Sequence, residues 1–226
     1  MTNAISSSAL EAAIFAPAIS LESCARAKGT AKIILGAENM YWEEKGAFTG
    51  EISPVMIKEV GCTHVIIGHS ERRHIFHETN EEVNKKVIAA LANELTPVMC
   101  VGELLQDRES GKTFDVIKTQ IVEGIKLIEP SEVAANVIIA YEPVWAIGTG
   151  KTASSEDAEE VCAYIRKLIA ELCGSECADK VIILYGGSVK SENTSSIMAQ
   201  NNIDGVLVGG ASLKVDSFTA IIEAAL

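Results

Sequence analysis

The chain has 226 residues and a formal net charge of -12, with 31 acidic side chains against 19 lysines and arginines. This acidic balance, without a basic patch, excludes a protein that binds nucleic acid through its charge. Hydrophobic residues make up 48% of the chain, yet no apolar run reaches the roughly 18 residues of a membrane helix. The first eleven residues lack the charged start and apolar core of a signal peptide. We therefore expect one cytoplasmic domain over residues 1–226, without a linker.

Short apolar runs alternate with helix-like runs along the chain, which is typical of βα units in a parallel sheet. Seven strands are expected, at 12–17, 32–40, 63–70, 96–103, 136–142, 181–188 and 205–212. Helices are expected over 20–29, from 54, from about 79, over 104–128, after 154, over 191–200 and at the end of the chain. Ser53 before Pro54, and Ser154 or Ser155 before acidic residues, are typical of helix starts. The sequence predicts an α/β fold.

Residues 41–53, with the sequence YWEEKGAFTGEIS, form an unusually long connection that is rich in aromatic residues and glycines. Such a loop on a parallel-sheet protein is more often functional or intersubunit than idle.

The cysteines and histidines give no signature of a metal site. The six cysteines contain no CxxC pair, which favours buried free thiols in a reducing compartment. Four histidines fall within fourteen residues, but they are spread over a strand end, a turn and a helix start. We expect no metal and no cofactor.

The stretch 141–152, YEPVWAIGTGKT, places the carboxylate of Glu142 at a strand end, ahead of a loop of small residues. Pro143 ends the strand, and residues 143–152 suit a loop that closes over a ligand. GTGKT resembles part of a nucleotide-binding P-loop, but Trp145 stands where that motif needs its first glycine. Taken alone, a carboxylate at a strand end such as Glu142 is more often a solvated cap or an ion-pair partner than a functional group.

Polar residues gather where the predicted strands end, and in parallel α/β folds this edge carries the active site. They are His69 and Glu71, Glu103, Glu142, Gly186–Ser188 and Gly209–Gly210. Backbone N–H groups of the two glycine-rich turns suit a phosphate without needing net positive charge, although each Gly-Gly alone is also a plain tight turn. A carboxylate, an imidazole, a closing loop and a phosphate site together indicate proton abstraction beside a carbonyl on a small phosphorylated substrate.

The motifs GHSERR, CVGE, AYEPVWAIGTGK, LYGGSVK and GVLVGGASL resemble the signatures of the triosephosphate isomerase family, in the family's order, from about Ala12 onward. The resemblance implies a (β/α) TIM-type barrel and an isomerase of glycolysis and gluconeogenesis that interconverts dihydroxyacetone phosphate and D-glyceraldehyde 3-phosphate. It implies Glu142 as the catalytic base and His69 as the neutral electrophile, a pairing for which this family is itself the standard worked example.

The resemblance also implies the supporting residues. Residues 143–152 would form the mobile lid, and the dimer loop 41–53 would join two subunits. The lid would be supported by Glu103, Tyr141, Trp145 and Tyr185, and the substrate phosphate would be held by Gly148, Ser188, Gly209 and Gly210.

The departure from the family pattern lies at the N-terminus. The family begins with a strand that ends in an Asn-Trp-Lys signature, whose lysine contacts the substrate, and nothing in this sequence matches it. We therefore expect an incomplete barrel of seven of the eight βα units, truncated at its start, with residues 1–11 as a flexible tail. Glu71, which lies near that lysine in the family, would lack its partner, and losing one such charge commonly lowers the rate about a few hundred-fold.

Three interpretations of function follow. The first is an active isomerase acting on a small phosphorylated triose. The second is a catalytically impaired phosphate-binding or interaction protein on the same scaffold. The third is a fragment of a longer isomerase.

Overall fold

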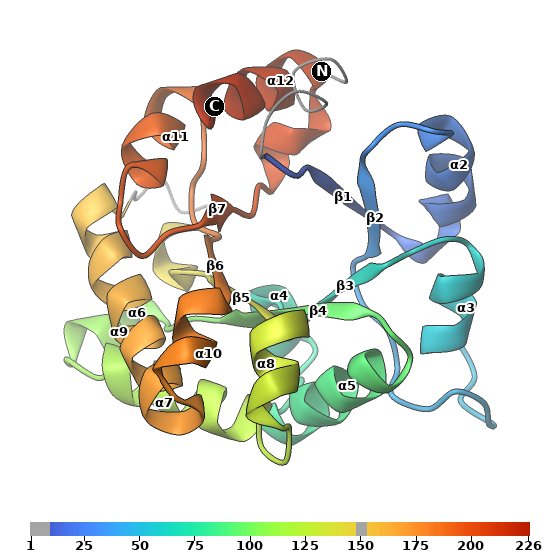
Figure 1. Cartoon of the computed structure of the whole chain (residues 1–226), viewed down its shortest axis with the longest axis horizontal. Coiled ribbons are helices and arrows are strands. Elements are labelled where there is room, and N and C mark those ends of the chain that lie inside the picture. The colour runs from blue at the N-terminus through green and yellow to red at the C-terminus, as the bar shows by residue number, and fades with distance from the viewer. Residues whose placement is uncertain (1–9, 148–152) are drawn as a thin grey trace. The chain divides into compact units, whose positions relative to one another are not determined.

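A computed structural model of the chain describes residues 10–147 and 153–226 (Figure 1). The chain divides into two compact units, Met1–Met99 and Cys100–Leu226. The single domain expected from the sequence stays a prediction.

The first unit contains parallel strands that are neighbours in chain order. Its elements are β1 (Ala13–Ala16), α2 (Ala18–Lys28), β2 (Ile34–Ala37), α3 (Pro54–Glu59), β3 (His64–Ile67), α4 (Ser70–Ile75), α5 (Asn80–Ala92) and most of β4 (Thr96–Val101). In Figure 1, α2, α3 and α5 lie along one side of these strands. Helix α5 begins with a capping box between Thr79 and Glu82 and buries Val83, Val87 and Ala90, whose spacing places them on one helix face.

The second unit begins at the end of β4 and is also parallel. Its further elements are α6 (Leu105–Glu109), α7 (Thr113–Gly124), α8 (Pro130–Asn136), β5 (Ile138–Tyr141), the 3₁₀ turn η1 (Val144–Ala146), α9 (Ser155–Cys173), α10 (Ser175–Lys180), β6 (Ile182–Tyr185), α11 (Ser191–Met198), β7 (Gly205–Val206), η2 (Gly210–Leu213) and α12 (Val215–Ala224). Strand β5 pairs with β6 and β6 pairs with β7, so their carboxyl ends share one edge of the sheet. Helix α9 is capped by Ser154 and packs Val161, Ile165 and Ile169 into the core.

All seven predicted strands are present in the described part of the chain, but several elements between them differ from prediction. The helix expected over 104–128 is two helices, because Gly111 takes a φ of +71° and ends the first one. Pro130 then starts α8, which was not predicted. Helix α10 was also missed; Gly174, with a φ of +91°, ends α9 and precedes α10 directly.

The predicted strands are longer than the observed ones, and at β3 and β7 this changes where a polar turn begins. Strand β3 ends at Ile67, and Ser70 already belongs to α4. Strand β7 stops at Val206 instead of residue 212, and Gly210 begins a 3₁₀ turn. Both polar turns therefore start earlier than the sequence indicated.

Two sequence expectations concern membranes and thiols. In residues 10–147 and 153–226 no helix is long and apolar enough to cross a membrane. The six cysteines are free: four are buried, as predicted, whereas Cys24 and Cys173 are partly exposed.

Candidate active site

His69 is positioned by the turn between β3 and α4. Gly68 takes a φ of +71°, and the guanidinium of Arg73 lies so close that a side chain at Gly68 would meet it at 2.9 Å. Arg73 also donates from Nε to the Gly68 carbonyl at 2.7 Å, which fixes the turn. His69 is therefore the N-cap of α4, directly after the carboxyl end of β3.

The imidazole of His69 accepts a hydrogen bond at Nδ1 from the backbone N–H of Glu71, at 3.3 Å. A nitrogen that accepts an N–H bond carries no proton, so the neutral ring has its proton on Nε2. That tautomer leaves Nε2 as a hydrogen-bond donor, which suits a neutral electrophile.

Acidic residues surround this imidazole. The Glu71 carboxylate lies 4.0 Å from Nδ1, and its side chain is 70% exposed. Burial raises the pKa of Glu38, which follows β2; His69 opposes the rise and Glu71 adds to it. Glu71 is among the residues predicted from the sequence, whereas Glu38 is not, although Glu38 also follows a strand end.

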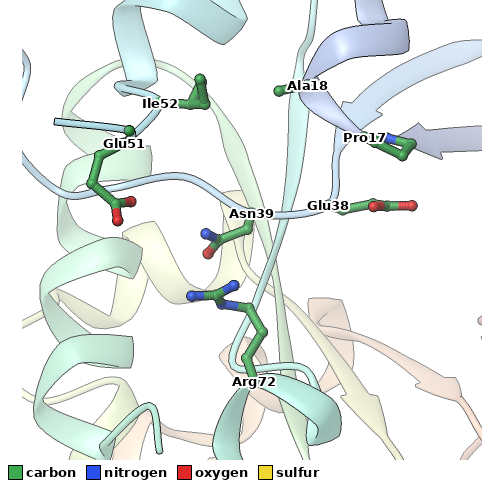
Figure 2. Close-up of a pocket in the computed structure, with 8 residues that line it drawn as sticks. Pro17, Ala18, Glu38, Asn39, Glu51, Ile52 and Arg72 are labelled. Carbon is green, nitrogen blue, oxygen red and sulfur yellow. The ribbon is translucent and has the colours of Figure 1, made fainter. Parts of the chain in front are cut away.

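A cleft of about 330 Å³ lies in the same unit (Figure 2). Figure 2 shows Glu38 and Asn39, Glu51 and Ile52 of the loop 41–53, and Arg72 from α4 around it. Arg72, which lines this cleft, and Lys86 pair with the two oxygens of buried Glu78, at 2.5 and 2.8 Å. Lys86 also donates to Asn39 at 2.9 Å.

Glu142 follows β5 in the second unit and keeps only 2% of its surface exposed. A Cβ atom built on Gly102, at the end of β4, would lie 1.8 Å from the Glu142 carbonyl oxygen. A Cβ atom on Gly186, at the end of β6, would lie 3.0 Å from Glu142 Cγ. Glu142 therefore fits here because a glycine follows each flanking strand: Gly102 leaves room for its backbone and Gly186 for its side chain.

Glu103 is fully buried and joins the end of β4 to η1, where the predicted lid begins. Its Oε1 accepts from the indole N–H of Trp145 at 2.8 Å and from the hydroxyl of Tyr141 at 3.2 Å. Its backbone carbonyl accepts from the N–H of Val144 at 3.2 Å. Three of the residues predicted to support the lid thus form one network.

Arg108 in α6 completes this network and was missed by the sequence analysis. It lies 3.7 Å from Glu103 Oε1, and its guanidinium stands 4.6 Å from the ring centroid of Trp145. It also pairs with Asp157 in the first turn of α9 at 2.5 Å. No motif in the sequence marked Arg108, because its role depends on the fold of α6 against the lid.

Burial controls the titration of this network. It raises the pKa of Glu103, although hydrogen bonds from Trp145 and Tyr141 and the charge of Arg108 oppose the rise. It also raises the pKa of Tyr141, and that of Tyr185 to about 12. The Tyr185 hydroxyl is buried without a partner among the described residues, and a Cβ atom on Gly187 would lie 2.2 Å from it.

The predicted phosphate residues follow the last two strands. Tyr185 is paired in register with Val206, so the turns after β6 and β7 share one edge. Ser188 is partly buried, and Gly209 and Gly210 are exposed at the start of η2. Gly148 lies outside the described residues.

These features define an α/β enzyme domain of the (β/α) barrel class, with its polar groups at the carboxyl ends of parallel strands. The family model for triosephosphate isomerase matches residues 1–225. The chain belongs to the triosephosphate isomerase family.

Individual relatives support this family membership. The triosephosphate isomerase of Caldanaerobacter subterraneus subsp. tengcongensis is 56% identical over 94% of this chain and 86% of that protein. That of Alkaliphilus metalliredigens is 54% identical over 95% of this chain and 86% of its own length. The crystal structure of the Bartonella henselae enzyme matches with a TM-score of 0.89 and 40% identity, over 99% of this chain and 89% of that one.

The family match extends further toward the N-terminus than expected from the sequence. The family model begins at residue 1, whereas the sequence analysis placed the start of the likeness at about residue 12. The expected absence of a first βα unit is therefore not confirmed. Residues 1–9 of the expected tail lie outside the described residues.

Proposed function

We propose that the chain interconverts dihydroxyacetone phosphate and D-glyceraldehyde 3-phosphate through an enediolate, without a cofactor, and that Glu142 is the base. The observation that carries this proposal is the placement of Glu142, buried at a strand end between Gly102 and Gly186. Membership of the triosephosphate isomerase family supplies the reaction. We infer a cytoplasmic location from the sequence.

Glu142 would take the proton from the substrate carbon and return it to the neighbouring carbon. A base that is already oriented before substrate binds needs little reorganisation, which lowers the barrier to proton transfer. The neutral imidazole of His69 would donate from Nε2 to the carbonyl oxygen and then move protons between the two oxygens. The acceptor bond at Nδ1 supports this role, because it leaves the donor on Nε2.

The lid would exclude water while the enediolate exists, which strengthens the electrostatic interactions and protects the intermediate from losing phosphate. The bonds from Trp145 and Tyr141 to Glu103 support a role of these residues in holding one lid position. The phosphate would be bound by main-chain groups of Gly148, Ser188, Gly209 and Gly210. Exposed glycines in an acidic protein support this, since backbone N–H groups bind anions without net positive charge.

The test is a coupled assay of glyceraldehyde 3-phosphate isomerisation, on protein purified from a host without its own isomerase. We expect turnover that Glu142→Gln lowers by at least about 10³-fold, because the amide cannot accept the proton. Glu160→Gln, an exposed position on α9, should leave turnover unchanged. Equal turnover in wild type and Glu142→Gln would overturn the assignment of the base. No turnover, with a phosphorylated ligand still bound, would favour the phosphate-binding alternative.

We further propose that two copies associate through the dimer loop 41–53. A bond from the Tyr41 N–H to the Ile52 carbonyl, at 2.8 Å, closes the base of this loop. Within it, Tyr41 stacks on Trp42 with ring centroids 4.0 Å apart and contacts Phe48 at 4.7 Å. An internally packed loop whose Phe48 is still 41% exposed suits contact with a second subunit.

Light scattering during size-exclusion chromatography tests this association. We expect wild type to elute with the mass of a dimer and Phe48→Ser to shift toward the monomer at low concentration. Phe114→Ser, at a similarly exposed aromatic on α7, is the control and should stay dimeric. A monomeric wild type over the same concentrations would contradict the proposal.

A further inference from the structure

Gln120, in the middle of α7, has its side chain turned to the end of β4. Its Oε1 accepts from the backbone N–H of Gly102 at 2.8 Å, and its Nε2 donates to the Gly102 carbonyl at 3.1 Å. Both residues are buried, and Gln120 keeps 8% of its surface exposed. One amide therefore satisfies both polar groups of a residue that has left the strand ladder.

Gly102 is also the residue against which the Glu142 backbone packs. The 1.8 Å approach of a built Cβ to the Glu142 carbonyl oxygen means that the two backbones touch with no room for a side chain. Glu142 itself donates its N–H to Val101 at 2.8 Å, and Val144 donates to Glu103 at 3.2 Å. The backbone that carries Glu142 is thus held on both sides of Gly102.

We propose that Gln120 is a positioning residue for the base: by fixing the peptide groups on either side of Gly102, it sets where the Glu142 carboxylate stands. This inference rests on the proposed function of Glu142. Gln120 would touch no substrate and would act through the backbone alone. A displacement of the base by a fraction of an ångström is enough to slow proton transfer, because that step depends steeply on geometry.

The first variant is Gln120→Met, which keeps the volume and removes both hydrogen bonds. We expect kcat to fall about ten-fold or more while KM changes less than about two-fold, since the substrate-binding groups are untouched. Gln200→Met is the matched control, because the amide of Gln200, just after α11, donates to the exposed carbonyl of Ser196 in that helix, at 3.2 Å. It should leave both constants unchanged.

The second variant, Gln120→Glu, gives a signature that a merely structural role would not produce. When protonated, its carboxyl offers Gly102 one donor and one acceptor, as the amide does. When ionised, it offers two acceptors and repels the Gly102 carbonyl. Burial raises the pKa of such a carboxyl, so the ratio of the variant's kcat to the wild-type kcat should be near one at low pH and fall as pH rises.

The pH profiles are measured over the range in which circular dichroism shows both proteins folded. A flat ratio near one for Gln120→Glu, together with a normal kcat for Gln120→Met, would overturn the inference. Should Gln120→Met not fold, the low-pH form of Gln120→Glu still carries the test. Glu142→Gln is assayed in parallel: unchanged activity in that variant would refute the proposed base, whereas its inactivity beside normal Gln120 variants would refute only the positioning role.

Discussion

In the first unit a buried lysine, Lys86, lies between the carboxylate of Glu78 and the amide of Asn39, whereas in the second unit a buried neutral amide, Gln120, satisfies the backbone of Gly102. The first arrangement pairs buried charges, so removing one of them leaves the remaining charges less well compensated. The second contains no charge, but Gly102, to which Gln120 is bonded, packs directly against the backbone of Glu142. Disruption should therefore lower stability in the first unit and activity in the second.

Lys86→Met should have the largest effect on stability. The lysine side chain is 4% exposed and Glu78 3%, and burial lowers the pKa of Lys86 even though Glu78 opposes this. Without Lys86, one oxygen of Glu78 loses its charged partner while Arg72 still pairs with the other, so the loss should lie below the about 3 to 5 kcal/mol of a fully broken buried pair. Urea unfolding followed by circular dichroism measures the loss.

The neighbouring lysine provides the control for this experiment. Lys85 pairs with Glu81 in the same helix, but its side chain is 46% exposed. Lys85→Met should change stability by about 0.5 kcal/mol or less. Similar losses for both lysines would show that burial of the pair does not matter and would remove the contrast between the two units.

Gly102→Ala should act on activity more than any other change to the packing around Glu142. The new methyl group meets backbone atoms, which have no rotamer by which to move aside, so the strand end itself must shift. We expect about 1 to 3 kcal/mol of destabilisation from overpacking and at least about a ten-fold loss of kcat. Gly111→Ala supplies the comparison: it strains a positive φ but meets no atom within 4 Å. It should cost stability without changing kcat.

The contrast between these two glycines also marks the limit of sequence reasoning. The seven strands and the polar strand ends were predictable, because apolar runs and the residues after them are local patterns. The same patterns led to Glu142, His69 and Glu103. That Gly102 must be glycine depends on the carbonyl of a residue forty positions later, and no local pattern contains that distance.

The helices that were missed have a similar cause. Helix α4 is six residues long and follows its N-cap His69 directly, so the polar motif around His69 hides the short helical pattern. Gln120 looked like an ordinary polar residue of a helix, although its side chain faces the core. Arg108 likewise has a role only through Trp145 and Asp157. Residues that position others are visible only once their partners are placed.

A smaller effect is expected from Glu103→Gln. Because burial raises the pKa of Glu103, the folded state holds its proton more strongly than the unfolded state does. The resulting stabilisation is present at low pH and is lost as pH rises from the ordinary glutamate range through the raised value. The amide cannot titrate, so thermal unfolding of the variant should lack this decline. An identical pH dependence in both proteins would assign the decline to other groups.

The smallest effect concerns the two capping boxes, at Thr79 in the first unit and at Ser154 in the second. Each alanine substitution should cost about 1 kcal/mol, because each hydroxyl accepts from the third backbone N–H of its helix. The difference lies in their partners. One oxygen of Asp157 accepts from the Ser154 hydroxyl at 2.9 Å, and the other accepts from Arg108 at 2.5 Å. The pKa of Asp157 is lowered: burial raises it, but the hydrogen bonds from Ser154 and the charge of Arg108 outweigh that effect. A double-mutant cycle of Ser154→Ala with Arg108→Met should thus show a coupling of about 0.5 kcal/mol, while Thr79→Ala with Arg108→Met should be additive. Additivity in both cycles would show that the cap of α9 is not coupled energetically to Arg108. The network around Trp145 would then include Glu103 and Arg108 but not the α9 cap.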